Sequence, residues 1–201
     1  MVMNSLWYKV LLKPGQMFRE LAGETEVQAL AVWPLTLLLL CLPPLFAAVG
    51  GSMFGWRLGM PVPLLMTAAQ TILISVLYWL LLCFGLFSTV VLARWMGATY
   101  GAQAGPGHYL GLFTVVCAPL SVASVAHLYP QVFFNILVLL PAVIWSMLLL
   151  YRGLPVVLHI SGERGMLMAS AIVGWLLVAM VSLLGLSVGL WTVGLGPAIG
   201  V

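Results

Sequence analysis

Long apolar stretches separated by short polar interruptions dominate the pattern of this chain. Four charge-free runs cover residues 27–56, 58–93, 95–151 and 165–201. A helix needs about 20 apolar residues to cross the hydrocarbon core of a bilayer, which is roughly 30 Å thick. Backbone groups in lipid must bond internally, and β-barrel strands would be shorter and alternating, so these runs predict helices.

The pattern predicts an all-α integral membrane protein that forms one domain over residues 1–201. The run 95–151 is too long for one helix, and Tyr129-Pro130-Gln131 divides it with a minimal turn. The helices on either side of this turn should therefore form a tight hairpin. The five expected transmembrane spans cover residues 27–49, 64–93, 108–128, 132–150 and 166–191.

Glycine and proline punctuate the regions between the expected spans. Residues 50–63 and 97–107 are rich in both and predict loops, and Arg94 is expected to mark the end of the second span. Gly153 and Pro155 fit the end of the fourth span.

The fifth span has start signals of its own. Ser161 is a suitable N-cap, and Glu163 would lie in the first turn, where a negative charge suits the helix dipole. The segment between the fourth and fifth spans, with Val156-Val157-Leu158, is too apolar for a free loop and should lie on the bundle or dip into the interface.

Two kinds of residue within the spans predict local geometry. Pro119 and Pro141 lie mid-way in the third and fourth spans and are candidate helix kinks. Gly185 and Gly189 form a GxxxG pair on the fifth span, which permits close helix packing, either within the bundle or between protomers.

Residues 1–26 are the most polar part of the chain. Apolar and cationic positions separate onto two sides between residues 4 and 21, which predicts a short amphipathic segment. Pro14-Gly15 interrupts it, so residues 16–22 should form a second short helix. Such a segment either lies in the headgroup plane of the membrane or packs on the helix bundle, and both interpretations stay open. It lacks the compact apolar region and the cleavage site of a signal peptide.

Composition excludes a soluble domain. Apolar residues make up 64% of the chain, charged residues only 5%, and the mean hydropathy is +1.20, whereas soluble domains carry roughly 25% charged residues. The net charge of +3 comes from scattered Lys and Arg without a basic cluster, so no nucleic-acid partner is expected. Membrane lipids, a second copy or another membrane protein are the expected partners.

The distribution of positive charge predicts an orientation. With five spans, six of the seven Lys and Arg residues fall on the side of the N-terminus, and only Arg57 falls on the other. The positive-inside rule then places the N-terminus in the cytoplasm and the C-terminus outside.

Candidate chemistry within the expected spans is sparse. The chain has no Asp, and no Glu, Lys or Arg lies within an expected span, as ion-coupled transport would require. Asn135 and Gln70 are the strongest polar candidates, and we expect each to make a helix–helix hydrogen bond. A channel or lipid pathway at the proline-broken helices stays open.

An enzyme or a metal site finds little support. His108 and His159 would share one side with Glu163 and Arg164, but no recognised spacing relates them. The three cysteines, Cys41, Cys83 and Cys117, are expected to be small buried apolar residues. We therefore expect no catalytic residue, metal or cofactor.

An ordered set of short motifs resembles a known family. The motifs are LLKPGQMFREL at 11–21, CAPL at 117–120, LYP at 128–130, YRGLP at 151–155 and ERG at 163–165. Together they resemble the Yip family, the Ypt/Rab-interacting membrane proteins, and within it the bacterial inner-membrane branch. The resemblance covers nearly the whole chain and implies five spans with a cytosolic N-terminus.

The resemblance does not bring Rab binding with it. Eukaryotic members carry a cytosolic Asp-Leu-Tyr-Gly-Pro motif, and this chain has no Asp and too short an N-terminal region for a comparable domain. The expected function is that of a non-enzymatic adaptor or membrane-organising protein acting through its cytoplasmic face. The candidate interaction or topology residues there are Arg152, Gly153, Pro155, Glu163 and Arg164. The alternative is a small-molecule or lipid permease with a path near Pro119 and Pro141.

Overall fold

The computed structural model describes residues 9–10, 12–57, 63 and 65–192. In chain order its helices are α2 (Pro14–Gly23), α3 (Glu26–Leu30), α4 (Trp33–Phe54), α5 (Ala68–Tyr100), α6 (Pro106–Ala123), the 3-10 helix η1 (Ser124–Leu128), α7 (Val132–Val157) and α8 (Gly162–Thr192). Five helical stretches are long and apolar enough to cross a membrane, the first being α3 and α4 together. The prediction of an all-α protein with five spans is confirmed.

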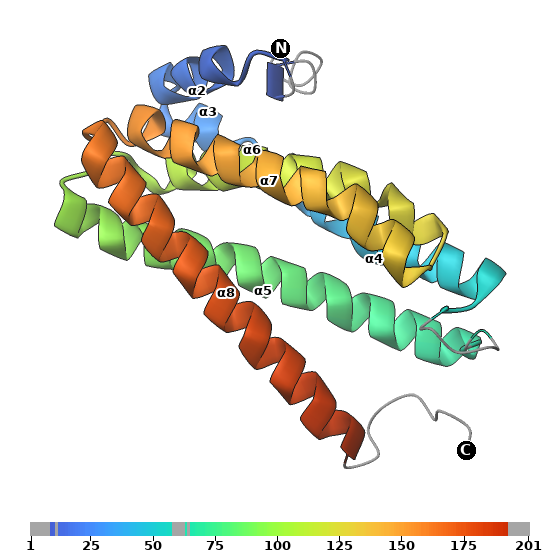
Figure 1. The fold of residues 1–201 in the computed structure, drawn as a ribbon. Helices are drawn as coiled ribbons and strands as arrows, with labels where there is room; N and C mark the ends of the chain where they lie inside the picture. Colours follow the sequence, from blue (N-terminus) through green and yellow to red (C-terminus); the bar gives the residue numbers. More distant parts are fainter. Residues whose placement is uncertain (1–8, 11, 58–62, 64, 193–201) are drawn as a thin grey trace.

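The five stretches run alternately up and down between two ends of the molecule. One end, here called the packed end, holds α2 and α3, the starts of α6 and α8 and the ends of α5 and α7 (Figure 1); there α2 contacts α6 and α7, and α3 contacts α6. At the other, the open end, the end of α4 meets η1 and the start of α7. The helix α8 contacts α5 and α7 near the packed end and then diverges from the bundle (Figure 1).

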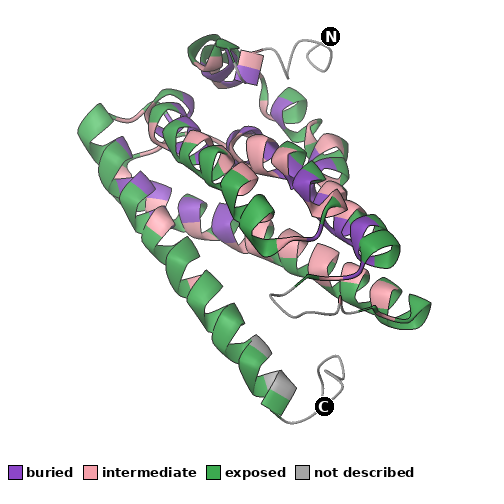
Figure 2. Ribbon diagram, turned by 45° about the vertical axis from the view of Figure 1, so that its right-hand side comes forward, coloured by how far each residue is buried: buried purple, intermediate pink, exposed green. Residues whose placement is uncertain are grey.

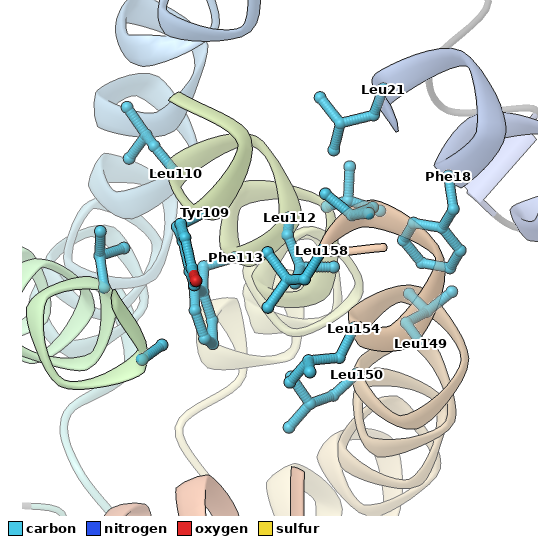
Figure 3. Packing of buried hydrophobic residues seen from close by; sticks show 14 of the residues in the cluster. Phe18, Leu21, Tyr109, Leu110, Leu112, Phe113, Leu149, Leu150, Leu154 and Leu158 are labelled. Carbon is cyan, nitrogen blue, oxygen red and sulfur yellow. The ribbon is translucent and has the colours of Figure 1, made fainter. Parts of the chain in front are cut away.

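The apolar core lies almost entirely at the packed end. The helix α6 is central to it, with ten of its eighteen residues buried. Figure 3 shows side chains from α2, α6 and α7 converging there, among them Phe18, Leu112 and Leu154. The second half of α8, from Gly174 onward, is exposed on nearly every described side chain (Figure 2).

The helix α2 is the amphipathic helix that the N-terminal pattern predicts. Its apolar residues Met17, Phe18 and Leu21 are buried against α6 and α7. Of the two alternatives left open by the sequence, packing on the bundle is the one observed for this face.

The predicted ends of the first and second spans were wrong, because each helix continues past the glycine or arginine that was expected to end it. The helix α4 runs on to Phe54, so Gly50 and Gly51 are helical, and close contacts with η1 and Trp56 leave no room for a side chain at either. The helix α5 does not stop at Arg94 but reaches Tyr100, where Gly101 adopts a left-handed conformation with φ of 76°.

The predicted end of the fourth span was also wrong. Gly153 and Pro155 lie inside α7, which ends at Val157. The residue that turns the chain is His159, in the left-handed conformation with φ of 55°, and the Ile160 N–H donates to the Pro155 carbonyl at 3.1 Å. This is the hydrogen bond of a Schellman motif, in which the left-handed position is usually glycine.

The segment between α7 and α8 lies on the bundle, as its apolar character predicted. Val157 and Leu158 are fully buried. Ser161 is the N-cap of α8, because its hydroxyl accepts a hydrogen bond from the Arg164 N–H at 3.5 Å and its carbonyl accepts one from Gly165 at 2.9 Å.

Candidate functional site

The predicted interaction residues of the fourth and fifth spans meet at the packed end, where α2, α7 and α8 join. Gly153 is the point at which α2 rests on α7. A Cβ atom at this position would come within 2.6 Å of the Phe18 ring and 2.7 Å of Leu112. Because Gly153 has no side chain, the Phe18 ring fits against α7 at this position, which is called the seat of Phe18 below. The ring points from α2 towards α7 (Figure 3).

A second close approach joins α7 to α8. A Cβ atom on Gly165 would lie 2.8 Å from Cβ of Pro155, so this glycine lets the first turn of α8 rest on the last turn of α7. The Arg164 guanidinium donates to the Tyr100 carbonyl at 3.4 Å, at the end of α5. A cation suits the C-terminal end of a helix, where carbonyl groups lack partners within the helix.

Three charged side chains at this junction stay exposed. Arg19 on α2, Arg152 on α7 and Glu163 on α8 make no ion pair or side-chain hydrogen bond with any described residue. By contrast, Lys9 binds the Glu20 carboxylate on α2 at 2.5 Å. The packed end thus combines a rigid apolar base with free charges on its surface.

A histidine–carboxylate cluster lies on the same end, but between other partners than the sequence suggested. The Glu26 carboxylate accepts a hydrogen bond from the Gly107 N–H at 2.5 Å and lies 3.2 Å from Nδ1 of His108. The other ring nitrogen of His108 lies 3.0 Å from the Glu24 carbonyl. Glu26 therefore occupies the N-terminus of α6, where a negative charge suits the helix dipole.

The contacts of this cluster all lie within the chain. Both carboxylate oxygens of Glu26 and both ring nitrogens of His108 have partners on α3, α6 or the segment before α3. The cluster joins α3 to the start of α6. His159 takes no part in it, and its ring is exposed beyond the end of α7.

The open end holds a separate pair, His127 and Asn135. The His127 Nδ1 atom lies 2.5 Å from Oδ1 of Asn135, so Asn135 does link α7 to η1. The corresponding expectation for Gln70 was wrong, because its side chain accepts hydrogen bonds from Thr67 at the start of its own helix, in a capping box.

The remaining candidates fall into two groups. Pro119 and Pro141 lie inside α6 and α7, and both helices continue past them; their role as kinks stays a prediction. At Gly185 and Gly189, no atom of the described chain lies within 4 Å of the place that a Cβ atom would take, so packing of this pair within the bundle is excluded for the described residues. Packing between protomers stays a prediction.

The cysteines do not form a site, although they are less buried than expected. Cys41 is exposed on the apolar surface of α4, and Cys83 and Cys117 are half-buried. Within the described ranges, no three His, Cys, Asp or Glu side chains are placed to hold a metal ion together.

Comparison with known proteins agrees with this architecture. The model of the Yip1 domain family matches residues 8–195, which is nearly the whole chain. The chain belongs to the Yip1 domain family. Its five apolar helices make it a multi-pass membrane member of that family.

Curated relatives of this Yip1-domain chain come from Escherichia coli. The inner membrane protein YohC of strain K12 is 27% identical over 158 residues, which cover 79% of this chain and 81% of YohC. YohC of strain CFT073 matches to the same extent. No solved structure matches.

Sequence reasoning missed Glu26 and Phe18 as parts of the packed end. A signal for Glu26 was present, because Thr25 and Gln28 have the spacing of a capping box and place Glu26 in the first turn of a helix. No local signal pairs Glu26 with His108, which lies 82 residues further along the chain. The motif YRGLP did mark the seat of Phe18, but its glycine was interpreted as a helix end.

Proposed function

We propose that this chain is a non-enzymatic adaptor or membrane-organising protein of a bacterial cytoplasmic membrane, acting through its packed end. The proposal rests on one observation: exposed charged side chains without a described partner lie on three helices that pack together. Arg19, Arg152 and Glu163 lie on α2, α7 and α8. Close contacts hold these helices together, between α2 and α7 at Gly153 and between α7 and α8 at Gly165. Pre-organised charges of both signs favour recognition of a complementary protein surface.

The overall distribution of charge supports the same end. Ten of the eleven Lys, Arg and Glu residues belong to segments at or near the packed end, and Arg57 is the exception. The packed end is therefore proposed to face the cytoplasm, by the positive-inside rule. The name of the relative YohC, an inner membrane protein, supports the choice of membrane.

A crosslinking experiment in native membranes tests the adaptor function. A photoreactive amino acid replaces Arg152 in one variant and Phe133, which is 72% exposed on α7 at the open end, in the matched control. The expected result is a discrete protein adduct at position 152 and lipid adducts at position 133. The adduct at position 152 should weaken when Arg19 and Glu163 are both changed to Gln. Lipid adducts alone at both positions would contradict an adaptor.

Cysteine labelling tests the orientation separately. In a chain whose three cysteines are replaced by Ala, Ser161→Cys reports on the packed end and Leu65→Cys on the open end, and both positions are exposed. An impermeant thiol reagent added to intact cells is expected to label position 65 only. Labelling of position 161 would reverse the orientation and remove the cytoplasmic assignment.

The permease alternative rests on one observation. An apolar cavity of about 430 Å³ lies beside η1 and the start of α7, between the third and fourth spans. Its lining includes Val125, Phe134 and Val138, but neither Pro119 nor Pro141. If a path existed there, widening it by Val138→Ala should raise the flux of an apolar dye through reconstituted vesicles. An unchanged flux would count against the alternative.

A further inference from the structure

A second cavity at the open end has polar groups that the proposed function does not use. It measures about 290 Å³, is partly open, and lies between α4, α5 and η1. Its apolar walls include Ala47, Ala48 and Ile74. Ligand pockets typically measure roughly 300–1,000 Å³, so this one has the size for the end of a larger molecule rather than the whole of it.

One face of α5 supplies hydroxyl groups to this cavity. Thr71, Ser75 and Tyr78 recur at a spacing of three to four residues and all line it. Thr71 donates to the Thr67 carbonyl at 3.1 Å, whereas the hydroxyls of Ser75 and Tyr78 make no hydrogen bond with any described residue. By the helical rise of about 1.5 Å per residue, they lie roughly 10–15 Å along α5 from its first residue, Ala68.

The third polar group is His127, and its contact with the Asn135 side chain fixes the orientation of its ring. The Asn135 amide nitrogen donates to the carbonyls of Tyr129 at 3.0 Å and Gln131 at 2.9 Å. The two carbonyls settle which side of the amide is nitrogen, so Oδ1 faces His127 and must accept from its Nδ1–H. In the neutral ring Nε2 is then an acceptor. No described residue donates to it.

Three polar groups that have no described partner and line one cavity point to a ligand. Polar groups without partners are costly in a low-dielectric environment, and lipid chains cannot supply hydrogen bonds. The lining contains no Asp, Glu, Lys or Arg, so it offers nothing to neutralise a phosphate or an ammonium group. A hydroxyl group fits, because it donates to Nε2 and accepts from the hydroxyls of Ser75 and Tyr78.

We propose that this cavity binds the hydroxyl end of an uncharged amphiphilic lipid, with Nε2 of His127 accepting its hydrogen bond. Ser75 and Tyr78 bind the same hydroxyl from α5. The apolar remainder of the lipid passes out through the open side, along α4 and α5. A diacylglycerol and a long-chain alcohol are two sources of this chemistry.

Photocrosslinking of the purified full chain in phosphatidylcholine vesicles tests the proposal. Four probes carry the same photoreactive acyl chain: a diacylglycerol, its O-methyl ether, a long-chain alcohol and a phosphatidic acid. The expected result is labelling of peptides that contain Ala47, Ser75 or His127 by one or both free hydroxyl probes. Unlabelled free hydroxyl lipid should compete, and the O-methyl ether should not. Which of the two hydroxyl probes labels identifies the source.

Two variants tie the labelling to the proposed groups. His127→Phe and the double variant Ser75→Ala/Tyr78→Phe should each reduce labelling roughly five- to tenfold, the effect of losing about one net hydrogen bond. His159→Phe, an exposed histidine at the other end, should label like the unchanged chain. If His127→Phe alters the unfolding transition, the double variant decides, because it removes only two hydroxyl groups.

Three outcomes would overturn the proposal. Equal labelling by the diacylglycerol and its O-methyl ether would show that the hydroxyl is not recognised. Stronger labelling by the phosphatidic acid would assign the cavity to an anion. No labelling of the three peptides by any probe would leave water as the occupant of the cavity.

Discussion

The two ends of this molecule differ in how their polar side chains are bonded. At the packed end, some polar groups are bonded within the chain and tie helices together: Glu26 with Gly107 and His108, and Arg164 with the end of α5, while three charged side chains stay exposed on its surface. At the open end, Ser75, Tyr78 and one nitrogen of His127 have no partner among the described residues. The bonded groups of the packed end thus hold its helices together, whereas the unpaired groups of the open end line the cavity that is proposed above to bind a lipid hydroxyl.

The burial of apolar side chains also differs between the two ends. Phe18, Leu112 and Leu154 are fully buried at the packed end, whereas Phe133 and Leu184 at the other end are 72% and 67% exposed. Exposed apolar side chains are stable there because lipid chains are as apolar as a protein core. Stability should therefore be concentrated at the packed end, and matched substitutions at the two ends can measure how strongly.

The largest expected effect is that of Phe18→Ala. Removal of a fully buried ring should lower the free energy of unfolding by about 3–5 kcal/mol, since the lost burial and the cavity left behind both contribute. Denaturant titration in detergent micelles measures it. Phe133→Ala is the control and should change the free energy by less than about 0.5 kcal/mol. Equal losses for both variants would remove the distinction between the ends.

A smaller loss is expected for Gly153→Ala. The new methyl group would meet the Phe18 ring at 2.6 Å and Leu112 at 2.7 Å, so one of them must move. Overpacking of this kind costs about 1–3 kcal/mol. Gly174→Ala on α8 is the matched control, because no described atom lies within 4 Å of the added methyl group. It should be neutral or slightly stabilising, and a loss there similar to that at Gly153 would argue against the proposed seat.

The polar cluster of the packed end should contribute less again. Glu26→Gln replaces the charged acceptor of Gly107 and His108 and should cost about 1–2 kcal/mol, as expected for a hydrogen bond to a charged group. Glu163→Gln changes an exposed carboxylate without a described partner and should cost less, at most the roughly 0.3–1 kcal/mol of its interaction with the dipole of α8. Hydrogen exchange at α3 offers a second readout, because loss of the cluster should release this helix from α6. No change in α3 would show that its apolar contacts suffice.

The sequence predicted the five spans because charges bracket the apolar runs and the length of a bilayer-spanning helix is fixed. It was misleading where glycine and proline were interpreted only as breaks. In lipid the backbone stays helical to satisfy its own hydrogen bonds, so Gly153 and Pro155 serve packing instead.

The candidate sites were predictable in part. Asn135 stood out as a polar residue in an apolar chain, but the 3-10 turn that pairs it with His127 has no distinctive sequence. The contact between Glu26 and His108 joins residues 82 apart, and only the packing of α3 on α6 brings them together. Distances of this kind depend on tertiary structure, which spacing along the chain does not encode.

The smallest expected effect concerns the turn that closes the packed end. His159 has a φ of 55°, a left-handed conformation that costs a side chain with a Cβ atom roughly 1–2 kcal/mol and glycine very little. His159→Gly should therefore raise the free energy of unfolding by up to about 1 kcal/mol, because glycine also gains freedom in the unfolded chain and part of the benefit is lost. His159→Ala keeps the Cβ atom and should bring no gain. If Ala stabilised as much as Gly, the imidazole rather than the backbone would be the source of the cost, and the turn would not limit the stability of this end.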